Sequence, residues 1–218
     1  MDFMVVIPVY NEEKRIGLVL ERLLRVTRNV IVVDDGSVDR TREVVARYPV
    51  TLLSFDKNVG KGAAVREGIR AAKTPVVVLI DGDNQHAPEE IPRLLSALEE
   101  SDLVIGSRFP QAAGMPAYRY WANRIIRAIV RLRAPMISDP LSGFRAFRRT
   151  AFLDLKEDGF TIDLEILFAA LRKGLRVSEV PISVSYPTKA ESKFSNPLTL
   201  TAIKEYLKLL LFALRNIL

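Results

Sequence analysis

The chain of 218 residues contains no cysteine, so disulfide bonds and thiolate metal sites are excluded. No stretch reaches the roughly 18 uninterrupted apolar residues that a membrane-spanning helix requires. The first residues, MDFMVVIPVYNEE, have no basic region before their apolar segment and do not resemble a signal peptide. These absences predict an intracellular protein that attaches to a membrane only peripherally, on the cytoplasmic face.

The charge of the chain is unbalanced. Lysine and arginine number 32 against 26 aspartates and glutamates, which gives a net charge of +6. This excess suits an anionic partner such as a phosphate group, a nucleic acid or an acidic lipid surface. Hydrophobic residues make up 49% of the chain, which is enough for a substantial core. The length fits one large domain or one domain with an appendage.

The apolar run of residues 76–80 has no polar member and leads directly into Asp81-Gly82-Asp83. Such a run is typical of a strand buried on both faces of a parallel sheet. Ligands of open α/β sheets collect at the carboxyl ends of strands, and two neighbouring carboxylates repel each other unless a cation lies between them. The pattern therefore fits a divalent metal site completed by substrate phosphates, or a polar turn that only ends the strand.

Strands and helices alternate along the first hundred residues. Strands are predicted at 3–8, 30–33, 50–55, 76–80 and 102–106, and helices at 16–24, 39–46, 63–72 and 88–100. This alternation predicts an α/β fold with a mostly parallel sheet flanked by helices. Polar clusters follow the strands at residues 10–12, 34–37 and 81–85, and we expect them to meet at one edge of the sheet.

Gly60 and Gly62, close to Lys57, Lys61 and Arg66, resemble a phosphate-binding loop. GKGAAV nevertheless lacks the full P-loop pattern, so a plain turn that opens a helix is the preferred interpretation. The GxGxxG pattern is also missing after the first strand, which argues against a dinucleotide enzyme.

Residues 117–133 have an amphipathic helical pattern, and no acid occurs between Asp102 and Asp139. One face carries Trp121, Ile125, Ala128, Ile129 and Leu132, and another carries Arg124, Arg127 and Arg131 flanked by Arg119 and Arg133. A solvated helix face usually mixes both signs of charge. The arginine face therefore predicts binding of phosphate or an anionic membrane, with pairing to acids elsewhere in the fold as the alternative.

The last third of the chain predicts a strand at 144–147, a helix at 160–171 and a strand at 177–186. The last strand contains Pro181, which predicts an edge strand or a bulge. Residues 198–218 have a helical pattern with a narrow polar stripe, and their apolar face is wider than one side of a domain usually needs. We therefore predict a main domain over residues 1–196 and a C-terminal amphipathic helix over residues 197–218. That helix could pack on its own domain, on another subunit or on a membrane surface, and the last two are the preferred interpretation.

The motifs of the chain resemble those of inverting nucleotide-sugar glycosyltransferases of the GT-A fold, and most of all the dolichyl-phosphate mannose and glucose synthases. In order they are IPVYNEE, VVDDGS, DGDNQH, GSR, DPLSGF and AESKF. The resemblance covers nearly the whole chain. It implies a Rossmann-like GT-A domain, a nucleotide-sugar donor, a dolichyl or polyprenyl phosphate acceptor and a Mg²⁺ or Mn²⁺ cofactor.

The resemblance also implies roles for individual residues. The metal would be bound by Asp81, Asp83 and Gln85. The nucleotide sugar would be bound by Pro8, Tyr10, Glu12, Val33, Asp35, Asp81, Gly82, Asp83, Arg108, Lys189 and Lys193. The acceptor phosphate would be bound by Arg119, Arg124 and Ser142, and the catalytic residues would be Asp83, Arg108 and Arg119.

GDP-mannose is the favoured donor, although Lys189 stands where the mannose synthases typically have arginine. FTIDLE around Asp163 and GKGAAV are closer to the glucose-type members, so UDP-glucose is the alternative donor. A lipid phosphate is already an anionic nucleophile at pH 7 and needs no general base. This agrees with a single histidine, His86, which we interpret as a structural neighbour of the metal site. Direct displacement at the anomeric carbon would convert an α-linked donor into a β-linked lipid product.

Other functions compete with this one. A soluble sugar or protein hydroxyl acceptor would need a base, for which Asp163 and Glu165 are the candidates. A nucleotidyltransferase also uses acidic metal pairs at a sheet edge, but it releases pyrophosphate. A nucleic-acid-binding module would use the arginine helix and leave the acidic strand ends unexplained, so we expect no nucleic-acid partner. A separate membrane subunit or a homo-oligomer stays open.

Overall fold

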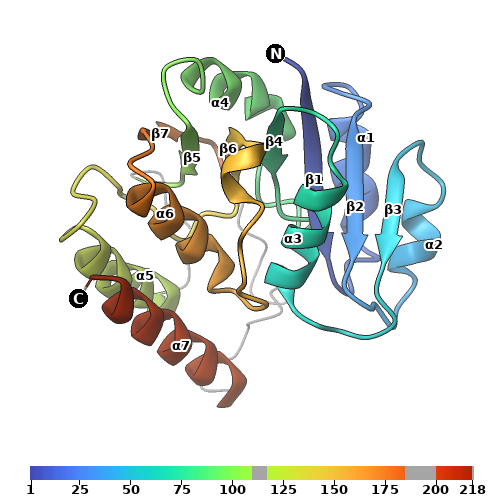
Figure 1. Ribbon diagram of the computed structural model, residues 1–218. Coiled ribbons are helices and arrows are strands. Elements are labelled where there is room, and N and C mark those ends of the chain that lie inside the picture. Colours follow the sequence, from blue (N-terminus) through green and yellow to red (C-terminus); the bar gives the residue numbers. More distant parts are fainter. Residues whose placement is uncertain (110–116, 185–199, 218) are drawn as a thin grey trace.

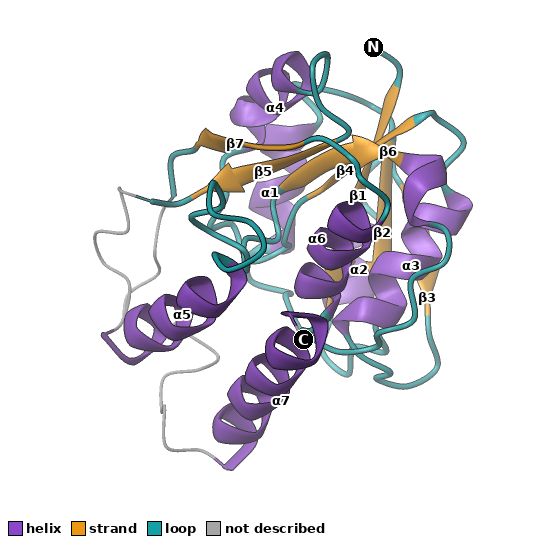
Figure 2. Ribbon diagram, turned by 60° about the vertical axis from the view of Figure 1, so that its left-hand side comes forward, coloured by secondary structure: helices purple, strands orange, loops and turns teal. Residues whose placement is uncertain are grey.

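The structure is a computed structural model that describes residues 1–109, 117–184 and 200–217. A seven-stranded sheet has the order β3-β2-β1-β4-β6-β5-β7, with helices on both faces (Figures 1 and 2). The strands are β1 (Phe3–Val9), β2 (Val30–Asp34), β3 (Thr51–Ser54), β4 (Val76–Leu79), β5 (Leu103–Ser107), β6 (Arg145–Arg148) and β7 (Val177–Pro181). The helices are α1 (Ile16–Leu23), α2 (Thr41–Val45), α3 (Lys61–Ala71), η1 (Pro88–Glu90), α4 (Ile91–Ala97), α5 (Ala117–Val130), η2 (Arg149–Phe152), α6 (Ile162–Arg172) and α7 (Leu200–Ile217).

The half of the sheet formed by β3, β2, β1 and β4 is parallel. Strands β2 and β4 are buried along their whole length, as expected for apolar runs covered by helices on both faces. Because β2, β1 and β4 are neighbours and run in one direction, the segments that follow them lie at the same edge of the sheet. The predicted α/β fold and the predicted meeting of the polar strand ends are therefore confirmed.

The other half of the sheet is mixed. Strand β6 lies between β4 and β5 and runs antiparallel to both, whereas β5 and β7 are parallel. The strand predicted at 177–186 is too long, since β7 ends at Pro181, which has no N–H to donate to a ladder. Beyond it Val184 pairs with His86 in an isolated antiparallel bridge, and residues 185 and 186 lie outside the described part of the chain. The prediction that Pro181 lies on an edge strand is confirmed.

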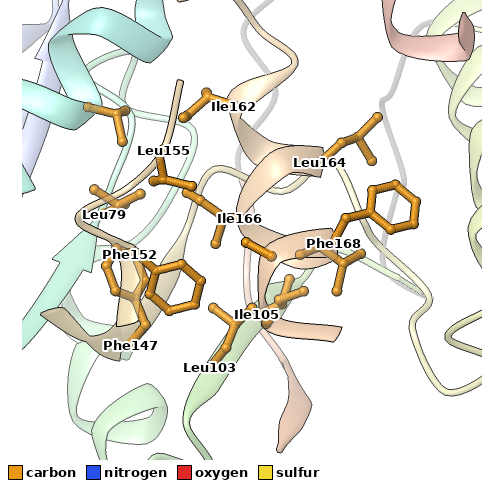
Figure 3. Close-up of a cluster of buried hydrophobic side chains, with 14 of the residues drawn as sticks. Leu79, Leu103, Ile105, Phe147, Phe152, Leu155, Ile162, Leu164, Ile166 and Phe168 are labelled. Carbon is orange, nitrogen blue, oxygen red and sulfur yellow. The ribbon is translucent and has the colours of Figure 1, made fainter. Parts of the chain in front are cut away.

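Two clusters of buried apolar side chains pack on opposite faces of the sheet. One cluster includes residues of α1, α2 and α4, and the other includes residues of α3, α5, α6 and α7. Figure 3 shows part of the second cluster, with side chains of α6 such as Ile162 and Ile166 beside side chains of the sheet such as Leu79 and Ile105. The sheet is thus held rigidly from both sides, which fixes the positions of the loops that follow its strands.

Helix α7 packs against α5 and α6 and contributes Leu209 and Ala213 to the second cluster. In Figures 1 and 2 α5 and α7 lie side by side at one end of the molecule. None of the helices in the described residues is long and apolar enough to cross a membrane. The domain boundary predicted between residues 196 and 197 falls outside the described residues and stays a prediction.

Candidate active site

The loop after β4 carries the two aspartates that the sequence predicts as metal ligands. Asp81 and Asp83 are both partly exposed beyond the carboxyl end of the strand. Gln85 donates from its backbone N to Asp83 Oδ1 at 3.1 Å and from Nε2 to Asp83 Oδ2 at 2.6 Å. The structure therefore brings Asp81, Asp83 and Gln85 together in one loop.

Two glycines permit close packing around this loop. A Cβ atom at Gly82 would lie 2.6 Å from the Cγ1 atom of Val9 in β1, which is too close. A Cβ at Gly143 would overlap the carboxylate of Asp81. The backbone at Gly143, in the DPLSGF segment, thus lies directly against Asp81, and any larger residue there would displace the carboxylate.

Lys61, the first residue of α3, pairs with two acids. Its Nζ lies 3.0 Å from Asp81 Oδ1 and 3.0 Å from Asp163 Oδ2. Burial opposes the ionisation of Asp81, but the nearby ammonium of Lys61 outweighs it and lowers the pKa of Asp81 to about 2. The same pairs raise the pKa of Lys61 above its usual range despite the burial of its ammonium. Lys61 was expected near this edge, but its direct contact with Asp81 was not.

The donor set fits a hard divalent cation. Mg²⁺ and Mn²⁺ prefer carboxylate and other oxygen ligands, and Mg²⁺ is commonly held by one or two carboxylates together with substrate phosphates. Burial and the neighbouring Asp81 carboxylate raise the pKa of Asp83, which shows that the two negative charges are close enough to repel each other. Within the described residues no three His, Cys, Asp or Glu side chains form a metal cluster on their own. A metal here would therefore need Gln85 and ligand oxygens to complete its coordination.

His86 is a buried neighbour of this loop. Its Nδ1 lies 3.9 Å from Asp81 Oδ2, and its ring lies 5.4 Å from that of Phe144. Neither ring nitrogen has a hydrogen-bond partner among the described residues. Burial lowers the pKa of His86, so the imidazole is neutral at pH 7. These features agree with a structural role for His86.

The ends of β1 and β2 supply the other residues predicted to bind the nucleoside. Tyr10 is exposed, whereas Glu12 is buried and receives Arg15 Nη1 at 3.1 Å on its Oε2. Pro8 and Val33 are paired in register across β1 and β2. The side chain of Val33 is fully buried in the core, so Val33 can contact a ligand only through its backbone.

Asp35 is also buried at this edge, where it holds the loop before α3. Its Oδ2 accepts hydrogen bonds from Asn58 Nδ2 at 2.8 Å and Gly60 N at 2.9 Å, and its Oδ1 accepts one from Val59 N at 2.8 Å. Burial raises the pKa of Asp35 in spite of these bonds. A ligand that binds Asp35 must therefore share the carboxylate with this loop or displace it.

The glycines of GKGAAV open α3 as a plain turn. The backbone N–H groups of Gly62 and Ala63 donate to the carbonyl of Asp158. Cβ atoms at Gly60 and Gly62 would overlap the carbonyls of Asp158 and Glu157, respectively. The N-terminus of the helix is thus capped by protein, which supports the plain-turn interpretation over a phosphate-binding loop.

Arg108 follows β5 and is held by Asp139, a residue to which sequence reasoning gave no role. Arg108 donates from its backbone N and Nε to Asp139 Oδ2 at 3.0 and 2.7 Å, and from Nη2 to Oδ1 at 2.8 Å. Although burial opposes it, the Arg108 guanidinium lowers the pKa of Asp139 below its usual range. Asp139 lies in the DPLSGF motif, so the sequence indicates that this segment is functional but does not predict the contact between Asp139 and Arg108.

Two of the three residues predicted to bind the acceptor phosphate, Ser142 and Arg124, have described side chains, and these lie in different environments. Ser142 is fully buried, and its Oγ accepts a hydrogen bond from Phe144 N at 3.3 Å. Arg124 is exposed on α5 and lies over the ring of Trp121 at 5.6 Å. The backbone of Arg119 lies in α5, but its side chain is outside the described part of the structure, as are Lys189 and Lys193. Their roles stay predictions.

The two candidate bases are engaged elsewhere. Asp163 is buried against Lys61, and burial raises its pKa even though Lys61 opposes the shift. Glu165 is also buried, and it accepts the backbone N–H groups of Lys156 and Glu157, each at 2.9 Å. Glu165 cannot take a proton from an acceptor without first giving up these partners. Asp163 Oδ1 has no hydrogen-bond partner among the described residues, but the side chain of Asp163 is buried.

Comparisons with known proteins identify relatives of the whole chain. The family model for glycosyl transferase family 2 matches residues 4–155. The dolichol-phosphate mannosyltransferase of Pyrococcus furiosus is 34% identical over 95% of this chain and 62% of that protein. The enzyme of the same name from Saccharomyces cerevisiae is 29% identical over 97% of this chain and 88% of that protein. An uncharacterized protein of Methanocaldococcus jannaschii is 32% identical over 91% of this chain and 87% of its own length.

A solved structure supports the fold. Glucosyl-3-phosphoglycerate synthase from Mycobacterium tuberculosis, in complex with Mn²⁺, UDP-glucose and phosphoglyceric acid, superposes with a TM-score of 0.77. The match covers 99% of this chain and 79% of that chain at 20% sequence identity, and it therefore concerns the fold alone. Together with the family match, it confirms the resemblance drawn from the motifs: the chain belongs to glycosyl transferase family 2 and is a glycosyltransferase with the GT-A fold.

Proposed function

We propose that the chain transfers a hexose from a nucleotide sugar, with GDP-mannose favoured, to dolichyl or polyprenyl phosphate with inversion. The observation that carries this proposal is the similarity to dolichol-phosphate mannosyltransferases, which extends over nearly the whole chain in two relatives. The DGD loop after β4 supports it, because its two carboxylates lie where α/β folds bind phosphorylated ligands.

On the donor side, Asp81, Asp83 and Gln85 would hold Mg²⁺ or Mn²⁺. When bound, the cation would neutralise the charge that develops on the leaving diphosphate. Tyr10, Glu12 and Asp35 would bind the nucleoside at the ends of β1 and β2, together with the backbone at Pro8, Val33 and Gly82. Arg108, Lys189 and Lys193 would contact the phosphates. These roles are assigned from the match between the motifs of this chain and those of the family.

On the acceptor side, an oxygen of the lipid phosphate would attack the anomeric carbon as the bond from that carbon to the diphosphate breaks. The products would be a β-linked sugar phosphate lipid and a nucleoside diphosphate. The phosphate carries no proton that must be removed at pH 7, so the engagement of Asp163 and Glu165 with protein partners is no obstacle. The burial of both carboxylates weighs against an acceptor hydroxyl, which would need an accessible base.

The surface of α5 and α7 suits a lipid-bound acceptor. Trp121 and Ile125 of α5 are exposed, as is Leu132 just beyond that helix, while α5 contacts the rest of the protein through Ile126 and Val130. Helix α7 exposes Ile203, Leu207, Leu211 and Leu214. Arg124 is exposed on α5 next to Ile125, and Arg131 follows the helix next to Leu132. Arg124, Arg127 and Arg131 form no ion pair with an acid among the described residues. We propose that this surface contacts an anionic membrane on its cytoplasmic face, with a membrane subunit or a second copy as alternatives.

UDP-glucose is the second donor candidate. The solved structure of the same fold is a complex with Mn²⁺, UDP-glucose and phosphoglyceric acid. Since that protein is only 20% identical to this chain, the similarity identifies neither the nucleobase of the donor nor the acceptor of this chain. The FTIDLE motif around Asp163 is also more similar to the glucose-type members of the family.

The test is a transfer assay with purified protein, Mn²⁺, a panel of nucleotide sugars and a short polyprenyl phosphate. We expect release of a nucleoside diphosphate and a β-linked lipid product, with GDP-mannose as the best donor. Asp83→Ala and excess chelator should each abolish transfer. Release of pyrophosphate, or sugar transfer only to soluble hydroxyl acceptors, would reject the proposal.

A further inference from the structure

The turn of residues 138–142 is held by opposite charges at its two ends. At the first end Glu179 of β7 accepts hydrogen bonds from Ser138 N at 2.8 Å, Ser138 Oγ at 2.7 Å and Asp139 N at 2.8 Å. A carboxylate that accepts several N–H and O–H groups from one turn restricts that turn far more than one neutral hydrogen bond would. Glu179 therefore fixes the backbone that carries Asp139.

A buried arginine holds the other end. Arg145 of β6 is 0% exposed and donates from Nε to Ser142 O and from Nη2 to Pro140 O, each at 2.7 Å. The turn thus presents N–H groups to an anion and carbonyl groups to a cation. This arrangement restrains the turn from β7 and from β6, the two strands on either side of β5, and leaves it little freedom to move.

Through Asp139, the restrained turn also holds Arg108 in place. Asp139 is 1% exposed and binds the backbone N, Nε and Nη2 of Arg108. Two of these contacts are a bidentate pair, which fixes the plane of the guanidinium as well as its position. Glu179 is paired in register with Ile105, on the strand that ends just before Arg108. The contacts therefore run from Glu179 to the turn, from the turn to Asp139, and from Asp139 to Arg108.

We propose that Glu179 is a positioning residue for Arg108, and thereby for the phosphate group that Arg108 binds. The inference rests on the proposed function, in which Arg108 contacts the phosphates of the nucleotide sugar. A partly buried carboxylate on an edge strand is costly unless it is well hydrogen-bonded, and Glu179 directs its bonds to the one turn that orients Arg108. A guanidinium that is oriented before the ligand arrives loses less conformational freedom on binding.

The first test measures the orientation of Arg108 without any activity. Hydrogen exchange at arginine Nε–H can be followed by nitrogen-15 NMR, and the Arg108 signal is assigned by its loss in Arg108→Lys. In Glu179→Gln the side-chain NH2 group must face either the two donors of Ser138 or the N–H of Asp139, depending on the orientation of the amide. In both orientations the turn loses an acceptor and loosens, so Arg108 Nε–H should exchange about tenfold faster. Ser178→Ala is the matched control, because Ser178 lies on the same strand and bonds Ser101 instead. Unchanged exchange in a folded Glu179→Gln protein would overturn the proposal.

The second test asks whether Glu179 acts through Arg108. Glu179→Gln should raise KM about three- to tenfold while kcat changes less, and separate titrations of nucleotide sugar and of lipid phosphate identify which phosphate is affected. In the Arg108→Lys background Glu179→Gln should add nothing further. Additive effects of the two substitutions would mean that Glu179 has only a general structural role, and would reject the inference. Glu179→Asp should restore part of the loss, and it replaces Glu179→Gln if that variant does not fold.

The two tests separate the inference from the function on which it rests. If no nucleotide sugar supports transfer, the proposed function fails and the exchange measurement alone decides the inference. If transfer occurs but Arg108→Lys has wild-type kinetics, Arg108 binds no phosphate and the inference fails while the proposed function stands.

Discussion

The ammonium of Lys61 lies 3.0 Å from Asp81 Oδ1 and equally close to Asp163, so one cation joins the start of α3, the end of β4 and the start of α6. These three segments are far apart in the sequence. The pair gives the proposed metal ligand Asp81 a partner of positive charge within the protein. A divalent ion that binds Asp81 would therefore experience repulsion from Lys61 at close range.

Removal of that charge should strengthen metal binding. We expect Lys61→Met to bind Mn²⁺ about tenfold more tightly than the wild type at pH 7. The substitution removes a positive charge that lies next to Asp81 and repels the cation. Mn²⁺ binding can be measured by electron paramagnetic resonance with no nucleotide present. Lys57→Met, an exposed lysine on the preceding loop, removes the same charge and serves as the control. Weaker or unchanged binding in Lys61→Met would show that Lys61 and the metal do not compete.

Asp81 should also make the stability of the protein depend on pH in the acid range. Its pKa is about 2 in the folded protein against a usual value of 3.8, so the unfolded chain takes up the proton first as pH falls. The contribution of Asp81 is therefore complete above about pH 4 and is lost as pH falls toward 2, which amounts to about 2 kcal/mol. The raised pKa values of Asp83 and Asp163 have the opposite sign and oppose this trend.

Urea unfolding between pH 2 and pH 5 measures this effect. The free energy of unfolding should fall less steeply for Asp81→Asn than for the wild type as the pH is lowered from 4 to 2. Equal slopes for the two proteins would contradict the assigned pKa of Asp81 and the dominance of its pair with Lys61.

The sequence predicts the acidic edge of the sheet but not the partners of its residues. The apolar runs before Asp35 and Asp81 can belong only to buried strands, and parallel strands place their ends at one edge. The contacts of Glu179 with Ser138 and of Lys61 with Asp163 join residues about 40 and 100 positions apart. Such pairs depend on the packing of whole elements, which hydrophobic periodicity does not encode. The antiparallel direction of β6 was missed for the same reason.

Burial also separates residues that look alike in the sequence. Arg145 and Arg148 lie on the same strand, but Arg145 is enclosed in the core while Arg148 is exposed and pairs with Asp102. Arg145→Met should lower the free energy of unfolding by about 2–4 kcal/mol, since the carbonyls of Pro140 and Ser142 would be left buried without a donor. Arg148→Met removes an exposed ion pair and should cost less than about 1 kcal/mol. Chemical denaturation at pH 7 compares the two, and equal losses would refute the role of Arg145 in holding the turn.

The surface of α5 and α7 gives a prediction about membranes. Ile125 is 55% exposed and Leu132 is 74% exposed, and arginines lie beside both. The full chain should sediment with liposomes that contain anionic lipid, and binding should weaken as salt is added because the arginines are screened. The double substitution Ile125→Glu with Leu132→Glu should reduce binding at least about tenfold, because it removes two apolar contacts and adds negative charge.

Leu18 provides the control for that experiment. It is 52% exposed on α1, whose buried residues belong to the cluster on the opposite face of the sheet from α5 and α7. Leu18→Glu adds a negative charge at an exposed leucine and should leave liposome binding unchanged. If it weakens binding as much as the double substitution does, the effect comes from net charge and not from the surface of α5 and α7. If the wild-type chain does not sediment at all, that surface contacts another subunit or a second copy of this chain, and the size of the complex in solution becomes the measurement that decides between them.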